Sequence, residues 1–284
     1  MPAKPNEKGW YELDRSINPI AVSELQAVGH IPKLSITHID LVTVRFASRL
    51  ICLQSVEQLW LWCNITRRAM RRVIQLPGLT TLDILFIRGP GSLAHFNKAN
   101  SLKTFRAHHC MSEHDLTCVS TCHSLEEIGA QGSDLTRTAL SSLLELPYLR
   151  ALDIEATKFD DAMARRVARS KTISSLDIGG TRITGKGLRS LVEMPQLKSL
   201  DLWATKITEE DLAILQNLPN LEYLSLGNYD GFPSLDSDRV VPLLLELPSL
   251  KRIWLDGVSV NATHRLALES KLESVRITKL EDTV

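Results

Sequence analysis

A short sequence pattern recurs at a fixed interval through the middle of this chain. It reads LRALDIEAT, ISSLDIGGT, LKSLDLWAT and LEYLSLGNY, beginning at Leu149, Ile173, Leu197 and Leu221, so each copy starts 24 residues after the last. A constant period of this length is typical of solenoid proteins, in which one supersecondary unit stacks on the next. One unit cannot bury its own apolar face, so the core must be shared between neighbouring units.

Each copy changes its hydrophobic period once. Leu200 and Leu202 alternate with polar neighbours, which predicts a short strand. Between Thr208 and Leu218 apolar residues recur every three positions, which predicts a helix with Thr208 as N-cap and acidic residues in its first turn. Pro219 then ends the helix. We therefore expect each unit to consist of a strand, a turn, a helix and a second turn.

The same register extends towards both ends and predicts about eleven copies. The further copies begin at Ile36, Val56, Leu79, Leu102, Leu125, Leu250 and Leu272. A weaker copy from Trp10, with Leu13 at its fourth position, is left open. We therefore interpret residues 1–35 as an N-terminal cap and residues 36–284 as the repeat array.

These residues resemble the leucine-rich-repeat family over residues 34–280. The L-x-x-L-x-L core recurs, and units with T-x-I-T and a terminal Leu-Pro are similar to bacterial repeats with a helical convex side. At the ninth position, where the family usually has Asn or Cys, Thr157, Thr181 and Thr205 are polar substitutes. The resemblance implies an α/β fold, a leucine-rich-repeat solenoid (horseshoe) with a concave parallel β-sheet and convex helices.

Three units depart from the regular length or composition. The step from Ile36 to Val56 is 20 residues, which predicts a shortened connection. Residues 88–91 read RGPG, which predicts a turn in place of the helix start. The unit from Leu221 is 29 residues long, with an insertion over residues 229–238. That loop either extends a binding surface or is a tolerated surface loop.

Positions five and seven of each copy should point outward onto the open sheet. In the Ile36 copy these positions fall on Asp40 and Val42. Four of the five tryptophans also occupy them, namely Trp60, Trp62, Trp203 and Trp254. Tryptophan is enriched at interface hot spots, which favours binding. The alternative is that the rings pack on neighbours and cover gaps left by glycines.

Acidic residues gather at the same outward positions. Asp153, Asp177 and Asp201 repeat on successive strands, with Glu155 beside them. Like charges about 5 Å apart repel by about 0.8 kcal/mol even in water, so a bound cation would stabilise the row, although solvated carboxylates are the alternative. Arg106, His108 and His109 predict a small basic spot. The predicted partner-binding residues are Trp60, Trp62, Asp83, Leu85, Phe86, Arg106, His108, Asp153, Glu155, Asp177, Asp201, Trp203, Tyr223, Trp254 and Asp256.

Composition excludes several classes of function. Lys+Arg and Asp+Glu are both 33, whereas a nucleic-acid-binding protein is more often basic. The N-terminus has no apolar region of a secretory signal, and no apolar run approaches the ~18–20 residues that span a bilayer. Five scattered cysteines suit a reducing compartment. We expect a cytoplasmic protein that binds neither nucleic acid nor membrane.

Signals for catalysis, cofactors and metals are weak. The cluster of His108, His109, Cys110, His114, Cys118, Cys122 and His123 suggests zinc. However, Cys122 lies on an apolar helical stripe and Cys110 at the ninth repeat position, so both are predicted in the core, and no C-x-x-C pair occurs. Phosphate-binding and nucleophile-elbow motifs are also missing from the sequence. We predict no enzyme activity, no cofactor and no metal.

The sequence therefore predicts a protein-binding module that acts through the concave sheet face. An acidic, tryptophan-rich face suits a partner with a basic surface. One form is an inhibitor or immunity protein that caps the functional surface of a partner such as a bacterial toxin. The alternative is an adaptor that recruits a protein substrate to a ligase or another enzyme. The sequence does not predict the oligomeric state.

Overall fold

Strands and helices alternate through both units into which the chain divides. The computed structural model describes residues 4–13, 19–37, 39–53, 55–89, 93–228 and 235–278. Unit 1 comprises Met1–Asp134 and Thr138–Leu149, and unit 2 comprises Leu135–Arg137 and Arg150–Val284. The same strand–helix repeat builds both units.

In unit 1 the strands pair in parallel, each beside the next in chain order. They are β1 (Tyr11–Leu13), β2 (Lys33–Thr37), β3 (Gln58–Thr66), β4 (Thr81–Arg88), β5 (Thr104–Ala107) and β6 (Glu127–Gly129). The helices are α1 (Pro19–Val28), α2 (Val44–Leu50), α3 (Arg67–Val73), the 3₁₀ helix η1 (Ala94–Lys98), α4 (Glu113–Val119) and α5 (Arg137–Leu144), whose first residue belongs to unit 2.

Unit 2 repeats this order. Its parallel strands are β7 (Ala151–Asp153), β8 (Ser175–Asp177), β9 (Ser199–Asp201), β10 (Tyr223–Gly227), β11 (Arg252–Asp256) and β12 (Ser274–Thr278). Its helices are α6 (Asp161–Val167), α7 (Gly185–Leu191), α8 (Glu209–Leu212), the 3₁₀ helix η2 (Ala213–Asn217), α9 (Ser237–Glu246) and α10 (Ala262–Lys271).

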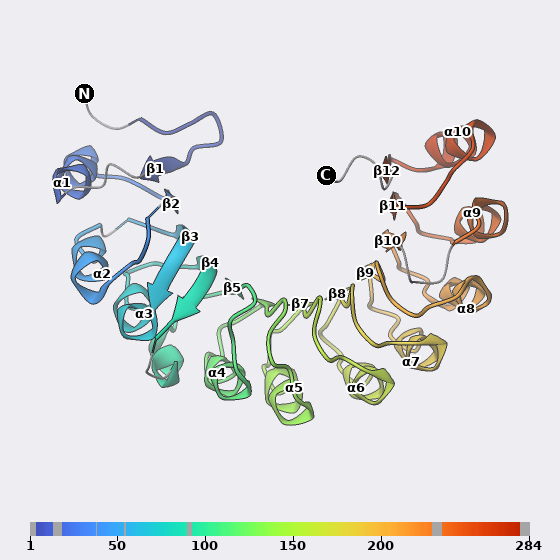
Figure 1. The fold of residues 1–284 in the computed structure, drawn as a ribbon, viewed down its shortest axis with the longest axis horizontal. Helices are drawn as coiled ribbons and strands as arrows, with labels where there is room; N and C mark the ends of the chain where they lie inside the picture. The colour runs from blue at the N-terminus through green and yellow to red at the C-terminus, as the bar shows by residue number, and fades with distance from the viewer. Residues whose placement is uncertain are drawn as a thin grey trace. The chain divides into compact units, whose positions relative to one another are not determined.

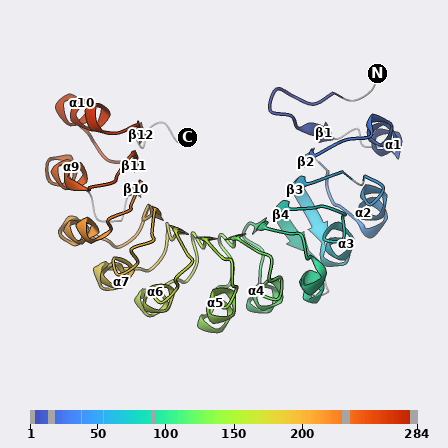
Figure 2. The same cartoon turned by 180° about the vertical axis from the view of Figure 1, so that it is seen from behind.

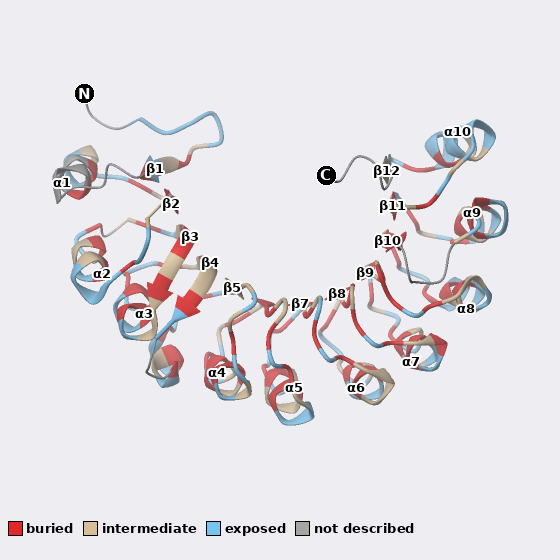
Figure 3. Cartoon of the chain, viewed as in Figure 1, coloured by how far each residue is buried: buried red, intermediate tan, exposed pale blue. Residues whose placement is uncertain are grey.

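In each unit the helices lie on one side of the strands, as Figures 1 and 2 show from opposite directions. We call this side the helix face and the opposite side the strand face. The buried segments follow the strands and the helix sides turned towards them (Figure 3). Leu200 and Leu202 are buried, and Thr208 is the N-cap of α8, in a capping box with Asp211. Both predictions for this unit are confirmed, although the helix continues beyond Leu212 as the 3₁₀ helix η2.

The threonines at the ninth position stabilise the turns that follow the strands of unit 2. Their hydroxyls donate hydrogen bonds to the carbonyl oxygen three residues earlier, at 2.7 Å for Thr157, 2.7 Å for Thr181 and 2.8 Å for Thr205. All three side chains are buried. A buried hydroxyl requires such a partner, so threonine is a workable substitute at this position.

The predicted register of the first repeats is wrong. Ile36 pairs with Leu61, so it occupies position six of its repeat rather than position one. Position one belongs to the buried Ile31, and the step from Ile31 to Val56 is 25 residues (56 − 31) rather than 20. Val42, predicted to point outward, is buried.

Two physical features explain this error. Ile36, Ile39 and Leu41 imitate the L-x-x-L-x-L spacing five residues too late. Pro32, which resembles the end of a preceding unit, instead opens the pairing of β2 with β3, because its carbonyl accepts hydrogen bonds from the backbone N–H groups of residues 57 and 58. In the predicted cap, β1 pairs with β2 so that Leu13 lies opposite Ile36.

The irregular units lie partly outside the described residues, which exclude 90–92 and 229–234. The turn predicted at 88–91 therefore stays a prediction, and both alternatives for the loop at 229–238, a binding surface or a tolerated surface loop, stay open. At the end of the insertion, Asp236 caps α9 and accepts a hydrogen bond from the Asp238 backbone N–H at 2.9 Å. Within the described ranges, no helix has both the length and the apolar character that a membrane span requires.

Candidate functional site

The outward side chains of unit 2 form rows across its strand face. In one row Asp153 pairs with Asp177 and Asp177 with Asp201, across β7, β8 and β9. Ser225 and Trp254 continue the row on β10 and β11. Neighbouring strands lie about 4.8 Å apart, so the carboxylates of successive repeats are within direct electrostatic range of one another.

Each aspartate of this row also holds the turn after its strand. One carboxylate oxygen accepts a hydrogen bond from the backbone N–H two residues further on, at 3.1 Å for Asp153, 3.1 Å for Asp177 and 2.8 Å for Asp201. The backbone then enters the left-handed region at Ala156 and Ala204, with φ of 54° and 51°. The recurrence of aspartate therefore has a structural reason as well as an electrostatic consequence.

A concavity of about 270 Å³ lies on the strand face of unit 2. It is lined by Glu155, Asp177, Gly179, Asp201, Trp203, Ser225, Trp254 and Asp256. Six of these were predicted as partner-binding residues; Gly179 and Ser225 were not. Gly179 keeps the space open, since a Cβ there would approach the Trp203 carbonyl to 3.3 Å. Four lining residues are carboxylates, two are tryptophans and none is basic.

Burial and mutual repulsion raise the pKa values of the central carboxylates. Burial, followed by the charges of Asp201 and Asp153, raises the pKa of Asp177 to about 8. Burial also raises the pKa of Asp201, although the hydrogen bond from the Trp203 backbone N–H acts in the opposite direction. The raised pKa values of Asp177 and Asp201 mean that their negative charges are poorly compensated within the fold.

The aromatic side chains beside these carboxylates are partly fixed by their own unit. The Arg276 guanidinium lies 4.3 Å from the centre of the Trp254 ring, and the indole N–H of Trp254 donates to the Thr278 hydroxyl at 3.3 Å. Trp203 is half-buried. Tyr223 is also half-buried, outside the concavity lining, and burial followed by the charge of Asp201 raises its pKa. Trp254 is thus oriented before any partner binds.

The aromatic residues predicted in unit 1 are less free than expected. The Trp60 ring packs against that of Trp10, with centroids 4.1 Å apart. Trp10 lies in the predicted cap, 50 residues before Trp60, so the sequence pattern does not predict this contact. Trp62 keeps 50% of its surface exposed, whereas Leu85 and Phe86 are half-buried. Trp62 is therefore the most accessible of these predicted anchors.

The predicted basic spot of unit 1 is largely neutralised by neighbouring acids. Arg106 forms ion pairs with Asp83, at 3.8 Å, and with Glu127. His108 lies between Gln131, at 3.0 Å, and Asp83, at 3.3 Å. These side chains form an interstrand network on the strand face, so Arg106 does not present a free cation there.

Carboxylate oxygens of Asp153, Glu155 and Asp177 lie within 4.8 Å of one another. Three carboxylates are compatible with a hard cation, but this grouping alone is common on acidic surfaces and we assign no ion to it. Of the cysteines in the zinc-like sequence cluster, Cys122 is buried as predicted and its thiol donates to the Ala99 carbonyl at 3.2 Å. Cys110, also predicted in the core, is only half-buried.

Comparison with solved structures identifies the fold. An internalin from Listeria monocytogenes aligns with TM-score 0.54 and 16% identity, over 96% of this chain and 82% of the internalin. A leucine-rich-repeat protein from Leptospira interrogans aligns with TM-score 0.56 and 15% identity, over 98% of this chain and 81% of that protein. The chain also aligns with TLR13 in a TLR13–ssRNA13 complex, with TM-score 0.52 and 17% identity, over 93% of this chain but only 38% of TLR13.

No protein-family model and no curated protein sequence matches the chain. The low identities to the solved structures make the likeness one of fold. Together with the parallel strands and alternating helices of both units, it shows that this is a leucine-rich-repeat solenoid, as the sequence predicts.

Proposed function

We propose that the chain is a protein-binding module whose strand face in unit 2 binds a basic surface of a partner protein. The observation that carries the proposal is the lining of the concavity there. It combines four carboxylates with Trp203 and Trp254 and contains no basic side chain. Such a site attracts a cation and offers it both hydrogen-bond acceptors and aromatic surface.

An arginine side chain matches this lining best. Its guanidinium donates two parallel hydrogen bonds to a carboxylate and also stacks on aromatic rings. Arginine and tryptophan are both enriched at interface hot spots. A bound cation would stabilise the ionised form of Asp177, which burial and the charges of Asp201 and Asp153 disfavour, and at neutral pH it would displace the proton that the raised pKa retains.

The solved-structure neighbours support the proposal through their fold alone. TLR13 was solved in complex with ssRNA13, which raises RNA as an alternative ligand. Phosphate groups would be repelled by the carboxylates of Glu155, Asp201 and Asp256, and by that of Asp177 once it is ionised. We therefore propose a protein for this face rather than RNA.

Within this proposal the first form is an inhibitor or immunity protein that covers a basic functional surface of its partner. The second form is an adaptor that holds the partner for another enzyme. The two differ in what happens to the partner. Loss of the partner's activity on binding is expected for an inhibitor, and unchanged activity is expected for an adaptor.

Binding of a nine-residue oligoarginine peptide tests the site. We expect the double variant Asp177→Asn/Asp201→Asn to bind the peptide at least about tenfold more weakly at pH 8.5, because two charge-assisted hydrogen-bond acceptors are lost. Titration calorimetry at low salt measures the affinity, and higher salt should weaken wild-type binding because the attraction is electrostatic.

The matched control is Glu193→Gln/Glu273→Gln, which also removes two negative charges from exposed positions of unit 2. We expect it to change the affinity by no more than about twofold. Equal weakening by the two double variants would mean that the peptide responds to net charge, and the proposed site would be rejected.

A further inference from the structure

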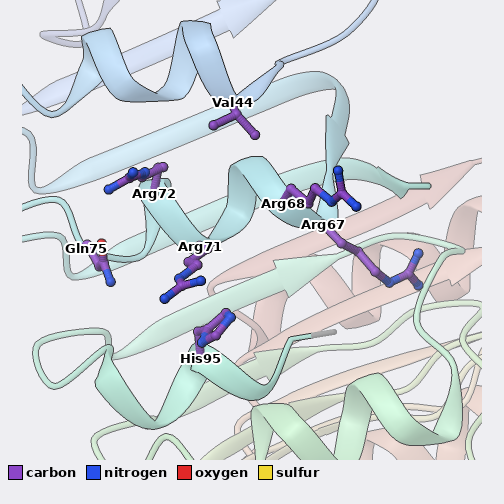
Figure 4. Close-up of a pocket in the computed structure, with 7 residues that line it drawn as sticks. All are labelled: Val44, Arg67, Arg68, Arg71, Arg72, Gln75 and His95. Carbon is purple, nitrogen blue, oxygen red and sulfur yellow. The ribbon is translucent and has the colours of Figure 1, made fainter. Parts of the chain in front are cut away.

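A second concavity, of about 570 Å³, lies among the helices of unit 1. It is lined by Val44, Arg67, Arg68, Arg71, Arg72, Gln75 and His95 (Figure 4). These residues come from the start of α2, from α3 and the turn after it, and from η1. None of the lining residues is acidic, so the chemistry of this site is opposite to that on the strand face of unit 2.

The packing of α3 brings its arginines to the surface together. Ala69, Met70 and Val73 are buried and turn one side of the helix towards the core. Arg68, Arg71, Arg72 and Gln75 follow the i, i+3, i+4, i+7 spacing that places residues on one helix side. Arg68, Arg71 and Arg72 are exposed. Arg68, Arg71 and Arg72 therefore line the same concavity, and Arg71 is the one that lies beside His95 of η1 (Figure 4).

Arg67 differs from the other arginines of the lining. Its guanidinium points away from Arg71 and His95 (Figure 4) and donates to both carboxylate oxygens of Asp115, at 3.2 and 2.6 Å. It also donates to the Gly89 carbonyl at 2.9 Å. Asp115 is thus used by Arg67 and is not available to the neighbouring arginines.

The remaining cations have no counterion within the part of the chain that the structure describes. No described carboxylate pairs with Arg68, Arg71 or Arg72, whereas Arg67 has Asp115. Figure 4 shows Arg71 extending towards His95. Burial, followed by the charges of Arg71 and Lys98, lowers the pKa of His95. The concavity thus has a positive potential that a bound anion would relieve.

The lining indicates which anion would bind. Planar guanidinium groups donate paired hydrogen bonds to phosphate oxygens. Val44 is the single aliphatic residue of the lining, and no Trp, Tyr or Phe is present on which a nucleobase would stack. The volume lies within the range of about 300–1,000 Å³ that is typical of small-molecule sites. These features favour a compact ligand over a nucleic-acid strand.

We propose that this concavity binds a small anion carrying several phosphate groups, held by Arg68, Arg71 and Arg72 with His95 at its edge. A neighbouring concavity of about 430 Å³ shares Val44 and Arg68 and adds Arg45. It gives a longer phosphate chain a second group of donors. This site is on the helix face of unit 1, and its occupation does not depend on the protein-binding role proposed for unit 2.

Inorganic tripolyphosphate is the probe for this site. We expect titration calorimetry with the full chain to show one bound tripolyphosphate, with affinity at least about tenfold lower in Arg71→Gln/Arg72→Gln. The matched control is Arg165→Gln/Arg169→Gln, which removes two exposed arginines of unit 2. Arg165 lies in the last turn of α6, and Arg169 lies two residues after the helix ends. We expect it to change the affinity by no more than about twofold.

A second measurement reports on the position of the ligand. Saturation with tripolyphosphate should raise the pKa of His95, followed by NMR, because a nearby negative charge stabilises the imidazolium. Equal weakening by the two double variants, or an unchanged His95 pKa, would overturn the proposal. So would tighter arginine-dependent binding of a single-stranded RNA oligomer or of phosphatidylserine vesicles, which would assign the site to those ligands instead.

Discussion

Replacing Asp115 with alanine is expected to lower the free energy of unfolding by about 3–5 kcal/mol, because it leaves the largely buried charge of Arg67 without its partner. The Asp115 side chain is 2% exposed and that of Arg67 is 17% exposed. Asp115 also accepts hydrogen bonds from the backbone N–H and hydroxyl of Ser112, at 3.1 and 2.9 Å. Its carboxylate therefore joins the start of α4 to the start of α3, 48 residues earlier.

The effect of this substitution should depend on pH. Burial alone would raise the pKa of Asp115, but hydrogen bonds from Arg67 and Ser112 hold it below its ordinary value. A lowered carboxyl pKa stabilises the fold above the unfolded pKa of about 3.9, and this stabilisation is lost as the pH falls through the folded value. The difference between wild type and Asp115→Ala should therefore shrink below about pH 4.

Urea denaturation at pH 7 measures the difference in stability. The control is Lys103→Ala, which removes an ion pair between Lys103 and Glu126. The two charged atoms lie 3.1 Å apart, and the lysine side chain is 60% exposed. We expect this control to change the free energy of unfolding by less than about 1 kcal/mol. The double variant Arg67→Ala/Asp115→Ala should lose less than the sum of the single variants. If Asp115→Ala lowered the free energy of unfolding no more than Lys103→Ala does, this description of the Arg67–Asp115 pair would be contradicted.

Replacing Asp177 with asparagine is expected to have the opposite effect and raise the free energy of unfolding at pH 8 by about 2–4 kcal/mol. The folded pKa of Asp177 is about 8, against an ordinary value of 3.8. The folded chain thus binds a proton that the unfolded chain releases, and stability falls as the pH rises from about 4 to about 8. Each pKa unit corresponds to about 1.36 kcal/mol, and partial solvent access reduces the full sum.

Asparagine removes this charge and leaves the local geometry unchanged, since its side-chain oxygen can still accept the hydrogen bond from Gly179. Urea denaturation at pH 4 and pH 8 should show a gain that is small at the lower pH and largest at the higher one. The exposed Asp40 serves as control, and we expect Asp40→Asn to change stability by less than about 0.5 kcal/mol. An equal gain for Asp177→Asn at both pH values would be inconsistent with a raised pKa.

The regular middle of the chain could be predicted closely from its sequence. Leu200, Leu202 and Thr208 lie where the repeat places them, because one spacing recurs without interruption from Leu149 to Leu221. The first repeats could not be placed in the same way. Both Ile31 and Ile36 begin an acceptable apolar pattern, and only the pairing of β2 with β3 distinguishes between them.

The sequence predicts the face on which the candidate site lies, but it does not predict how deeply the side chains of the site are buried. Strand alternation places Asp177 and Asp201 on the strand face, because side chains alternate across a strand. Trp203 lies in the turn after β9 and lines the same concavity. The raised pKa of Asp177 depends on burial by neighbouring repeats, which no local pattern reports. The contact between Trp10 and Trp60 likewise joins residues that are distant in sequence.

The central claim is that the carboxylates on the strand face of unit 2 bind the cations of a basic protein surface. Proton release on binding tests it most directly, because an arginine placed beside Asp177 lowers its pKa from about 8 and expels the proton that it holds at pH 7. Titration calorimetry with oligoarginine, in two buffers of different ionisation enthalpy, counts the protons released. We predict about one proton per bound peptide for the wild type and a much smaller release for Asp177→Asn. Binding without proton release, or with the same release from both proteins, would contradict the claim.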